Sequence, residues 1–144
     1  ALLSHPNIIS IQDQGWNEGG AQAVFIVMEL VEGSTLRDKL VAEGNLTISE
    51  SLKYLRAILS ALSAAHKIGI VHRDIKPANI MYELDSDTVK VTDFGIARIT
   101  DSSKTKTGMV LGTPSYMSPE QLAGKKVEGR SDLFSLAKSQ RLQL

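Results

Sequence analysis

A chain of 144 residues is long enough for one domain with a sizeable core, and its 16 Lys and Arg balance 16 Asp and Glu, which excludes a strong overall attraction to nucleic acid or to an acidic membrane. It has no cysteine, which excludes disulfides, zinc–thiolate sites and thiol nucleophiles and fits a reducing compartment. Because the longest apolar run, Val24 to Met28, is far shorter than the ~20 residues of a membrane span, we expect a cytoplasmic domain without a membrane segment or a nucleic-acid partner.

Two β-branched, apolar segments open the chain, at residues 7–16 and 23–30. The Gly- and Asn-containing segment at residues 17–20 separates them, which predicts an antiparallel pair of strands. The polar and glycine residues at 32–34 predict that the second strand stops there.

A long amphipathic helix is expected next. Thr47 and Glu50 have the spacing of a capping box, and Gly69 marks the end of the pattern. Apolar or aromatic residues follow at three- and four-residue steps, which predicts that this stripe faces the core: Leu52, Leu55, Leu59, Leu62 and His66.

Two short apolar runs follow, at residues 79–84 and 88–92, and the turn-prone sequence Asp-Ser-Asp joins them, which predicts a small hairpin. Between Asp93 and Glu120 the chain is rich in Gly, Ser, Thr, Lys and Pro and shows little periodicity. Loops of that length are usually functional or disordered.

Four polar residues around this hairpin suit a magnesium-bound phosphate: Asp74, Lys76, Asn79 and Asp93. Magnesium prefers one or two carboxylate or amide oxygens plus water and phosphate, so Asn79 and Asp93 fit it if the hairpin brings them together. Asp74 would then accept or orient a hydroxyl proton, and Lys76 would neutralise charge on the phosphoryl group. Taken singly, each aspartate is more often a cap or a turn residue.

Three motifs carry a family resemblance. The sequence HRDIKPAN at residues 72–79 is similar to the catalytic loop of protein kinases, and DFG at residues 93–95 is similar to their magnesium-binding motif. The sequence GTPSYMSPE at residues 112–120 resembles the end of the activation loop. Lys76 and Thr113 are typical of serine/threonine kinases, so the chain resembles a eukaryotic-type (Hanks-type) serine/threonine protein kinase of the kind also found in bacteria.

The resemblance implies an α+β, protein-kinase-like fold that is incomplete. It holds the end of the small β lobe, the hinge and the first half of the mainly helical large lobe. The implied divisions are the small lobe at residues 1–28, the hinge at 29–35, the large lobe at 36–136, and a tail at 137–144 that departs from the family pattern.

The same resemblance implies transfer of the γ-phosphoryl group of ATP, with Mg²⁺, to Ser or Thr hydroxyls of protein substrates. Asp74, Lys76 and Asn79 take the catalytic positions, and Asn79 and Asp93 hold the metal. The positions that bind the nucleotide are Glu29, Val31, Lys76, Asn79, Met81 and Asp93. Met28 matches the gatekeeper next to the hinge, although plain core packing explains a methionine there equally well.

Other positions acquire regulatory or structural roles by resemblance. Arg73 would pair with a phosphate on the activation loop, for which Thr105 and Thr107 are the preferred sites, although such a loop can simply be solvated. Thr113 would face the substrate. His72 would be a packed core residue without acid–base chemistry, and Asp132 would anchor the backbone of the catalytic loop.

Departures from the family pattern leave two functions open. The sequence lacks a G-x-G-x-x-G loop and a V-A-I-K lysine, and it starts without Met, so we expect a fragment. Ser118 replaces the usual alanine, and the family's arginine partner of Glu120 is missing. The chain is then a piece of an active kinase, inactive alone, or a non-catalytic product that acts only by binding proteins.

Overall fold

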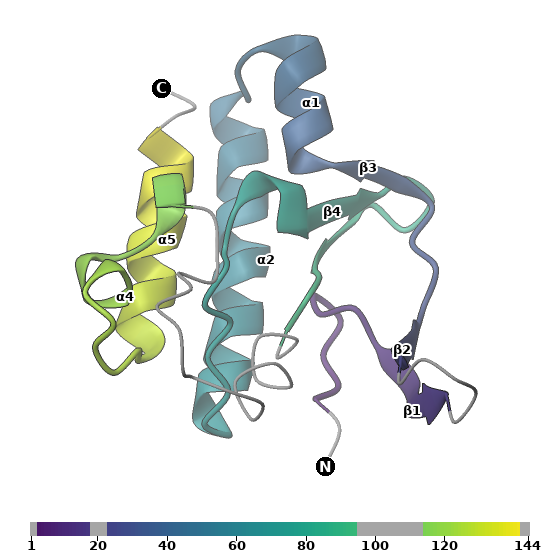
Figure 1. The fold of residues 1–144 in the computed structure, drawn as a ribbon. Coiled ribbons are helices and arrows are strands. Elements are labelled where there is room, and N and C mark those ends of the chain that lie inside the picture. Colours follow the sequence, from purple (N-terminus) through teal and green to yellow (C-terminus); the bar gives the residue numbers. More distant parts are fainter. Residues whose placement is uncertain (1–2, 18–22, 95–113, 142–144) are drawn as a thin grey trace.

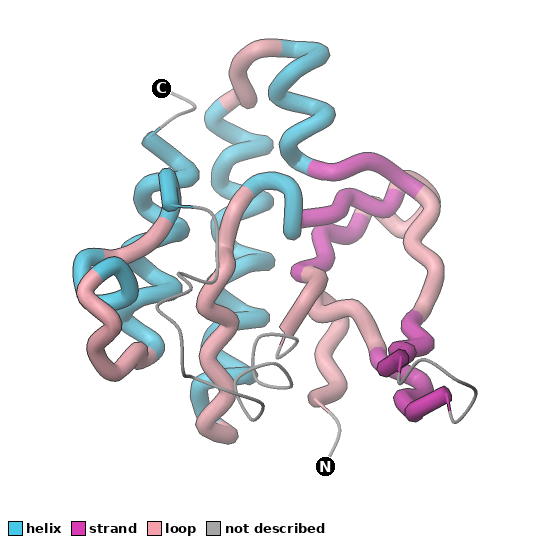
Figure 2. The backbone as a smooth tube through the Cα atoms, viewed as in Figure 1, coloured by secondary structure: helices cyan, strands magenta, loops and turns pink. Residues whose placement is uncertain are grey.

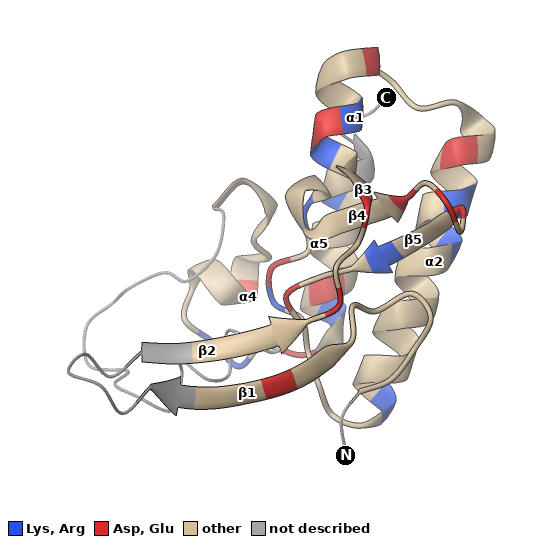
Figure 3. Ribbon diagram, turned by 90° about the vertical axis from the view of Figure 1, so that its right-hand side faces the viewer, with Lys and Arg blue, Asp and Glu red and all other residues tan. Residues whose placement is uncertain are grey.

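A computed structural model describes residues 3–17, 23–94 and 114–141 (Figure 1). The elements, in chain order, are β1 (Ile11–Asn17), β2 (Ala23–Met28), β3 (Gly33–Thr35), α1 (Leu36–Glu43), α2 (Ile48–Lys67), the 3-10 turn η1 (Pro77–Asn79), β4 (Ile80–Glu83), β5 (Thr88–Val91), the 3-10 turn η2 (Pro114–Tyr116), α4 (Pro119–Leu122) and α5 (Gly129–Arg141). Helix α2 lies between α4 and α5 on one side and the sheet β3–β4–β5 on the other (Figure 1). The β1–β2 hairpin projects away from the helices (Figure 3).

The predicted antiparallel pair β1–β2 is confirmed, but its first strand is shorter than expected. Residues 7–9 do not belong to β1. They pair instead in parallel with β5, where the Val91 amide donates to the Asn7 carbonyl at 2.8 Å and the Ile9 amide donates to the Val91 carbonyl at 3.0 Å. A β-branched pattern does not specify which strand is the partner. The prediction therefore joined two segments with different partners, β2 and β5, into one strand.

The predicted stop of the second strand is confirmed, since β2 ends at Met28, but Gly33–Thr35 form an edge strand, β3, that was not predicted. Gly33 pairs with Glu83 and Thr35 pairs with Met81 on β4. A Cβ atom on Gly33 would lie 1.8 Å from the Tyr82 carbonyl oxygen, so only glycine permits this approach. Gly33 therefore marks a close contact between β3 and β4, after the end of β2.

Helix α1 was not predicted, although its signal is present in the sequence. The Thr35 hydroxyl accepts from the Asp38 amide at 3.1 Å, and the Thr35 amide donates back to the Asp38 carboxylate at 3.4 Å. The spacing of Thr35 and Asp38 is that of a capping box.

The capping box of α2 is confirmed. The Glu50 amide donates to the Thr47 hydroxyl at 3.2 Å, and the Thr47 amide donates to the Glu50 carboxylate at 2.9 Å. The helix ends at Lys67, and Gly69 follows with φ of 76°, a left-handed conformation that favours glycine.

The predicted leucine stripe of α2 is partly wrong. Leu52 and Leu59 are 46% and 40% exposed. The residues of α2 that are buried are Tyr54, Ile58, Ala61, Leu62 and Ala65. They pack with Ile75, Val89 and Val91, so the sheet and the loop after α2, rather than leucine spacing, select the buried face. That loop turns back from the end of α2 toward η1 and β4 (Figure 2).

Helix α5 continues through residues 137–141, where the sequence departs from the family pattern. Two of its buried serines, Ser135 and Ser139, are compatible with burial because each hydroxyl donates to a backbone carbonyl one turn earlier. Ser135 donates to Ser131 at 3.1 Å and Ser139 donates to Ser135 at 2.9 Å. Among the helices of the described ranges, none has the length and apolar character needed to cross a membrane.

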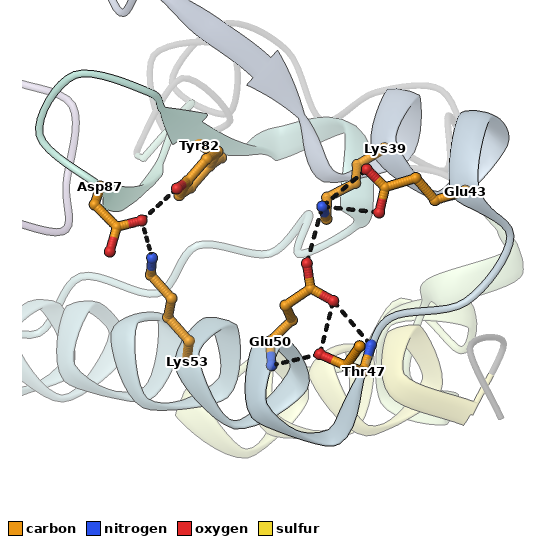
Figure 4. A network of polar contacts seen from close by, with 7 residues as sticks. All are labelled: Lys39, Glu43, Thr47, Glu50, Lys53, Tyr82 and Asp87. Atoms are coloured by element: carbon orange, nitrogen blue, oxygen red, sulfur yellow. Dashed lines mark hydrogen bonds and ion pairs between the residues drawn. The ribbon is translucent and has the colours of Figure 1, made fainter.

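A polar network joins α1, α2 and the β4–β5 turn (Figure 4). Lys39 lies 2.9 Å from the Glu43 carboxylate and 3.0 Å from that of Glu50. The hydrogen bonds from the Thr47 amide and from Lys39 lower the pKa of Glu50 to about 2. Glu50 therefore caps α2 and ties it to α1 with one carboxylate.

This coupling predicts how stability depends on pH. A carboxyl with an ordinary pKa of 4.5 that falls to about 2 on folding stabilises the fold above pH 4.5 and loses that effect as the pH falls toward 2. Glu50→Gln should therefore lower the melting temperature by a few degrees at neutral pH, and its difference from the wild type should shrink in acid.

Melting curves followed by circular dichroism between about pH 7 and pH 2.5 measure this difference. Glu32→Gln, the same change at an exposed position before β3, is the matched control. A difference between Glu50→Gln and the wild type that stays constant over this range would contradict the role of Glu50.

Candidate active site

The site begins with a buried carboxylate on α5. Asp132 is fully buried, and its two oxygens accept from the His72 amide at 2.9 Å and from the Arg73 amide at 2.7 Å. The sequence expectation that Asp132 anchors the catalytic-loop backbone agrees with this geometry. Arg73 has φ of 71°, a left-handed conformation that a non-glycine residue keeps only when its surroundings hold it.

A third donor group on Asp132 was missed by the sequence analysis, which placed His66 in the apolar stripe of α2. The His66 Nε2 atom lies 2.8 Å from the Asp132 carboxylate. A Cβ atom on Gly129 would lie 2.7 Å from His66 Nδ1, so glycine at the start of α5 makes room for the ring. Only the packing of α2 against α5 brings His66 and Asp132 together.

The His72 ring connects the catalytic loop to the segment that follows β5. Its Nε2 faces the Thr92 carbonyl at 2.7 Å and must donate, whereas its Nδ1 accepts from the Asp74 amide at 3.2 Å. This arrangement needs the neutral imidazole, and burial lowers the pKa of His72. The ring also packs edge-on against Phe94, with centroids 4.6 Å apart. The predicted structural role of His72 is confirmed.

The three predicted catalytic residues lie together. The Asp74 carboxylate is 2.7 Å from the Lys76 ammonium and accepts from the Asn79 amide at 3.2 Å. The Asn79 amide also donates to the Asp74 carbonyl at 2.8 Å, and Asn79 is buried. The NH₂ group of Asn79 donates to Asp74, so the side-chain oxygen of Asn79 is the atom of this amide that can accept a hydrogen bond or bind a metal.

The predicted closure of the hairpin is confirmed, since the Thr92 amide donates to the Asn79 carbonyl at 3.0 Å. This bond places Asp93 one residue beyond the pairing partner of Asn79. Asp93 has φ of 65°, so the chain turns sharply out of β5 at this residue. Asn79 and Asp93 thus flank the open end of the hairpin.

These oxygens fit magnesium better than a metal held by protein alone. In the described part of the chain, no group of three His, Cys, Asp or Glu side chains is placed to bind a metal. A pair such as Asn79 and Asp93 instead matches the sparse protein contribution that magnesium accepts when phosphate and water complete its shell.

Glu29, in the predicted hinge, is held from two directions. The Glu29 carboxylate accepts from the Ser10 amide at 3.1 Å and pairs with Lys90 on β5 at 2.9 Å. Burial opposes ionisation of Glu29, but the hydrogen bonds from Lys90 and Ser10 outweigh it and lower its pKa. Val31 is buried, and between described residues no hydrogen bond uses its amide. Met81 lies on the central strand β4, paired with Lys90.

Several predicted residues lie outside the described ranges: Thr105, Thr107 and Thr113. Where the chain is described again, Ser118 is buried and caps α4. Glu120, for which the sequence offered no arginine, accepts from the Ser131 hydroxyl at 2.5 Å, and this bond lowers its pKa.

The fold and these motifs define a protein kinase. The family model described as "Protein kinase domain" matches residues 1–138, so the chain belongs to the protein kinase family.

Two bacterial serine/threonine kinases are among its relatives. The chain is 48% identical over 142 residues to serine/threonine-protein kinase pkn3 of Myxococcus xanthus, covering 93% of the chain and 26% of pkn3. It is 47% identical over 140 residues to PknB of Mycobacterium tuberculosis, covering 94% of the chain and 22% of PknB. The crystal structure of the M. tuberculosis PknI kinase domain matches with a TM-score of 0.78 at 31% identity, over 98% of the chain and 51% of that domain. The chain therefore spans about a quarter of the pkn3 and PknB sequences.

The anchoring role of Asp132 leads to a stability prediction. In Asp132→Asn one of the two side-chain oxygens becomes an NH₂ group that faces a backbone donor, so a buried amide loses its acceptor. We expect the free energy of unfolding to fall by about 1–3 kcal/mol.

Urea unfolding followed by circular dichroism measures this loss. Asp85→Asn makes the same chemical change in the exposed β4–β5 turn and should stay within about 0.5 kcal/mol of the wild type. Equal stability of the two variants would show that Asp132 does not anchor the backbone of the catalytic loop.

Proposed function

We propose that this chain carries the catalytic loop and metal-binding motif of a serine/threonine protein kinase that transfers the γ-phosphoryl group of ATP to protein hydroxyls. The observation that supports this most directly is the cluster of Asp74, Lys76 and Asn79. The amide of Thr92, the residue before Asp93, also donates a hydrogen bond to the Asn79 carbonyl. Phosphoryl transfer depends mainly on positioning and electrostatics, which such a rigid cluster supplies.

Asp74 is the group that acts on the acceptor hydroxyl. Its carboxylate is oriented by Lys76 at 2.7 Å and by the Asn79 amide at 3.2 Å, so it can accept a hydroxyl proton in a fixed direction. Lys76, 2.7 Å from that carboxylate, would direct its charge to the phosphoryl oxygens of the transferred group.

Asn79 and Asp93 are the residues that would hold magnesium, through the side-chain oxygen of Asn79 and the carboxylate of Asp93. Bound Mg²⁺ neutralises charge on the phosphate oxygens. The contribution of the chain is to hold the backbones of Asn79 and Asp93 at the same end of the hairpin, which the hydrogen bond from the Thr92 amide to the Asn79 carbonyl supports.

The adenine of ATP would lie against the hinge. The Glu29 carbonyl and the Val31 amide offer an acceptor and a donor on the same stretch of backbone, and Met81 lies on β4 opposite Thr35 of β3. The Glu29 side chain is engaged by Lys90 and Ser10, so recognition falls to its backbone.

Control and substrate contact belong to the segment before α4. A phosphate on Thr105 or Thr107 would pair with Arg73, and Thr113 would face the protein substrate. We place this activity in the cytoplasm, where ATP and magnesium are available.

The test uses the protein encoded by the full reading frame around these residues, beside the 144-residue chain. Asp74→Asn should lower kcat by roughly 100-fold or more with little change in KM for ATP, because Asp74 acts on the hydroxyl and not on the nucleotide. Radiolabelled γ-phosphate transfer to a Ser/Thr protein measures both constants. Asp85→Asn is the matched control.

The same assay decides between the two functions left open by the sequence. We expect the 144-residue chain alone to transfer little phosphate, since its sequence contains neither the glycine-rich loop nor the small-lobe lysine. If the full-frame protein also transfers none, or if Asp93→Ala leaves its activity intact, the kinase proposal fails and a protein-binding role is favoured.

A further inference from the structure

One side chain of α4 reaches the catalytic loop and has no role in the function described so far. Gln121 completes the cap of α4, because its Oε1 atom accepts from the amide and the hydroxyl of Ser118, each at 3.2 Å. Its Nε2 atom donates to the Arg73 carbonyl at 2.7 Å. The Gln121 amide therefore joins the start of α4 to the residue before Asp74.

The chemistry of this contact requires a primary amide. The Ser118 amide is a donor, so it needs the oxygen of Gln121, and the Arg73 carbonyl is an acceptor, so it needs the nitrogen. A glutamate would satisfy Ser118 equally well, since Glu is favoured at this capping position, but it would place a carboxylate oxygen against the Arg73 carbonyl.

The contact falls on a residue of the loop that is held on both sides. Arg73 has φ of 71°, its amide donates to Asp132 on α5 at 2.7 Å, and its carbonyl accepts from Gln121 on α4. Both peptide groups that flank Arg73 are thus held by side chains from elements about 50 or more residues later in the sequence. The second of these peptide groups is the one that carries the Asp74 amide.

We propose that Gln121 is a positioning residue that couples α4 to the catalytic loop and thereby sets the orientation of Asp74. This inference rests on the proposed function, in which Asp74 acts on the acceptor hydroxyl. The bridge links α4 to the peptide group before Asp74 through the hydrogen bond from Gln121 to the Arg73 carbonyl.

Two substitutions separate the bridge from the cap. Gln121→Glu keeps the capping acceptor and removes the donor to Arg73. Ser118→Ala removes the capping hydroxyl and keeps the Gln121 amide. If Gln121 acts only as a cap, Ser118→Ala should be the more disruptive change.

Hydrogen exchange of the 144-residue chain provides the first measurement. Gln121→Glu should accelerate exchange of the Arg73 and Asp74 amides roughly fivefold or more, whereas Ser118→Ala should affect mainly the amides of residues 119–124. Equal exchange of Arg73 and Asp74 in the two variants would overturn the proposal.

A spectroscopic measurement covers the case in which Gln121→Glu fails to fold. In the unmodified chain, scalar coupling across the hydrogen bond should connect Gln121 Nε2 to the Arg73 carbonyl carbon in a triple-resonance NMR experiment. A Gln121 side-chain amide that exchanges at the rate of an exposed amide and shows no such coupling would refute the bridge.

Kinetics of the full-frame protein test the effect on catalysis. Gln121→Glu should lower kcat roughly tenfold without raising KM for ATP, and Ser118→Ala should leave both near the wild-type values. A higher KM for ATP with unchanged kcat would overturn the positioning role. If the unmodified protein transfers no phosphate, the proposed function fails, while exchange and scalar coupling still decide whether the bridge exists.

Discussion

The buried carboxylate of Asp132 is the constraint on which the rest of the site depends. A charge without solvent contact is tolerated only where donors surround it, and Asp132 receives the amides of His72 and Arg73 and lies 2.8 Å from the His66 ring. These groups come from α5, the catalytic loop and α2. One side chain therefore joins three segments that are far apart in the sequence, and the loop takes its shape from the helix behind it.

The loop stores backbone strain that these contacts hold in place. Arg73 and Asp93 both have positive φ, a conformation that costs a non-glycine residue about 1–2 kcal/mol. The His72 ring connects the segments that contain these two residues, because one ring nitrogen accepts from the Asp74 amide and the other donates to the Thr92 carbonyl. The strained turns are thereby fixed relative to each other, and they present Asp74 and Asp93 on neighbouring segments.

Features encoded by short-range chemistry were predictable. The capping box of Thr47 and Glu50, the end of α2 near Gly69 and the hairpin closure at Asn79 all depend on residues within about fifteen positions of one another. The misses have a common cause. Leu52 and Leu59 follow helical spacing but are exposed, because the buried face of α2 is selected by the sheet and the returning loop, which the period of one helix does not reveal.

The sequence alone determined the family and the capping box of α2, because motif spacing and local hydrogen bonding need no tertiary context. Only the tertiary structure placed the His66 ring beside Asp132, paired Gly33 with β4, and brought the Gln121 side chain to the Arg73 carbonyl. Each of these depends on packing between residues that are distant along the chain. Such contacts form only when the core that α2 shares with the sheet and with α5 is assembled.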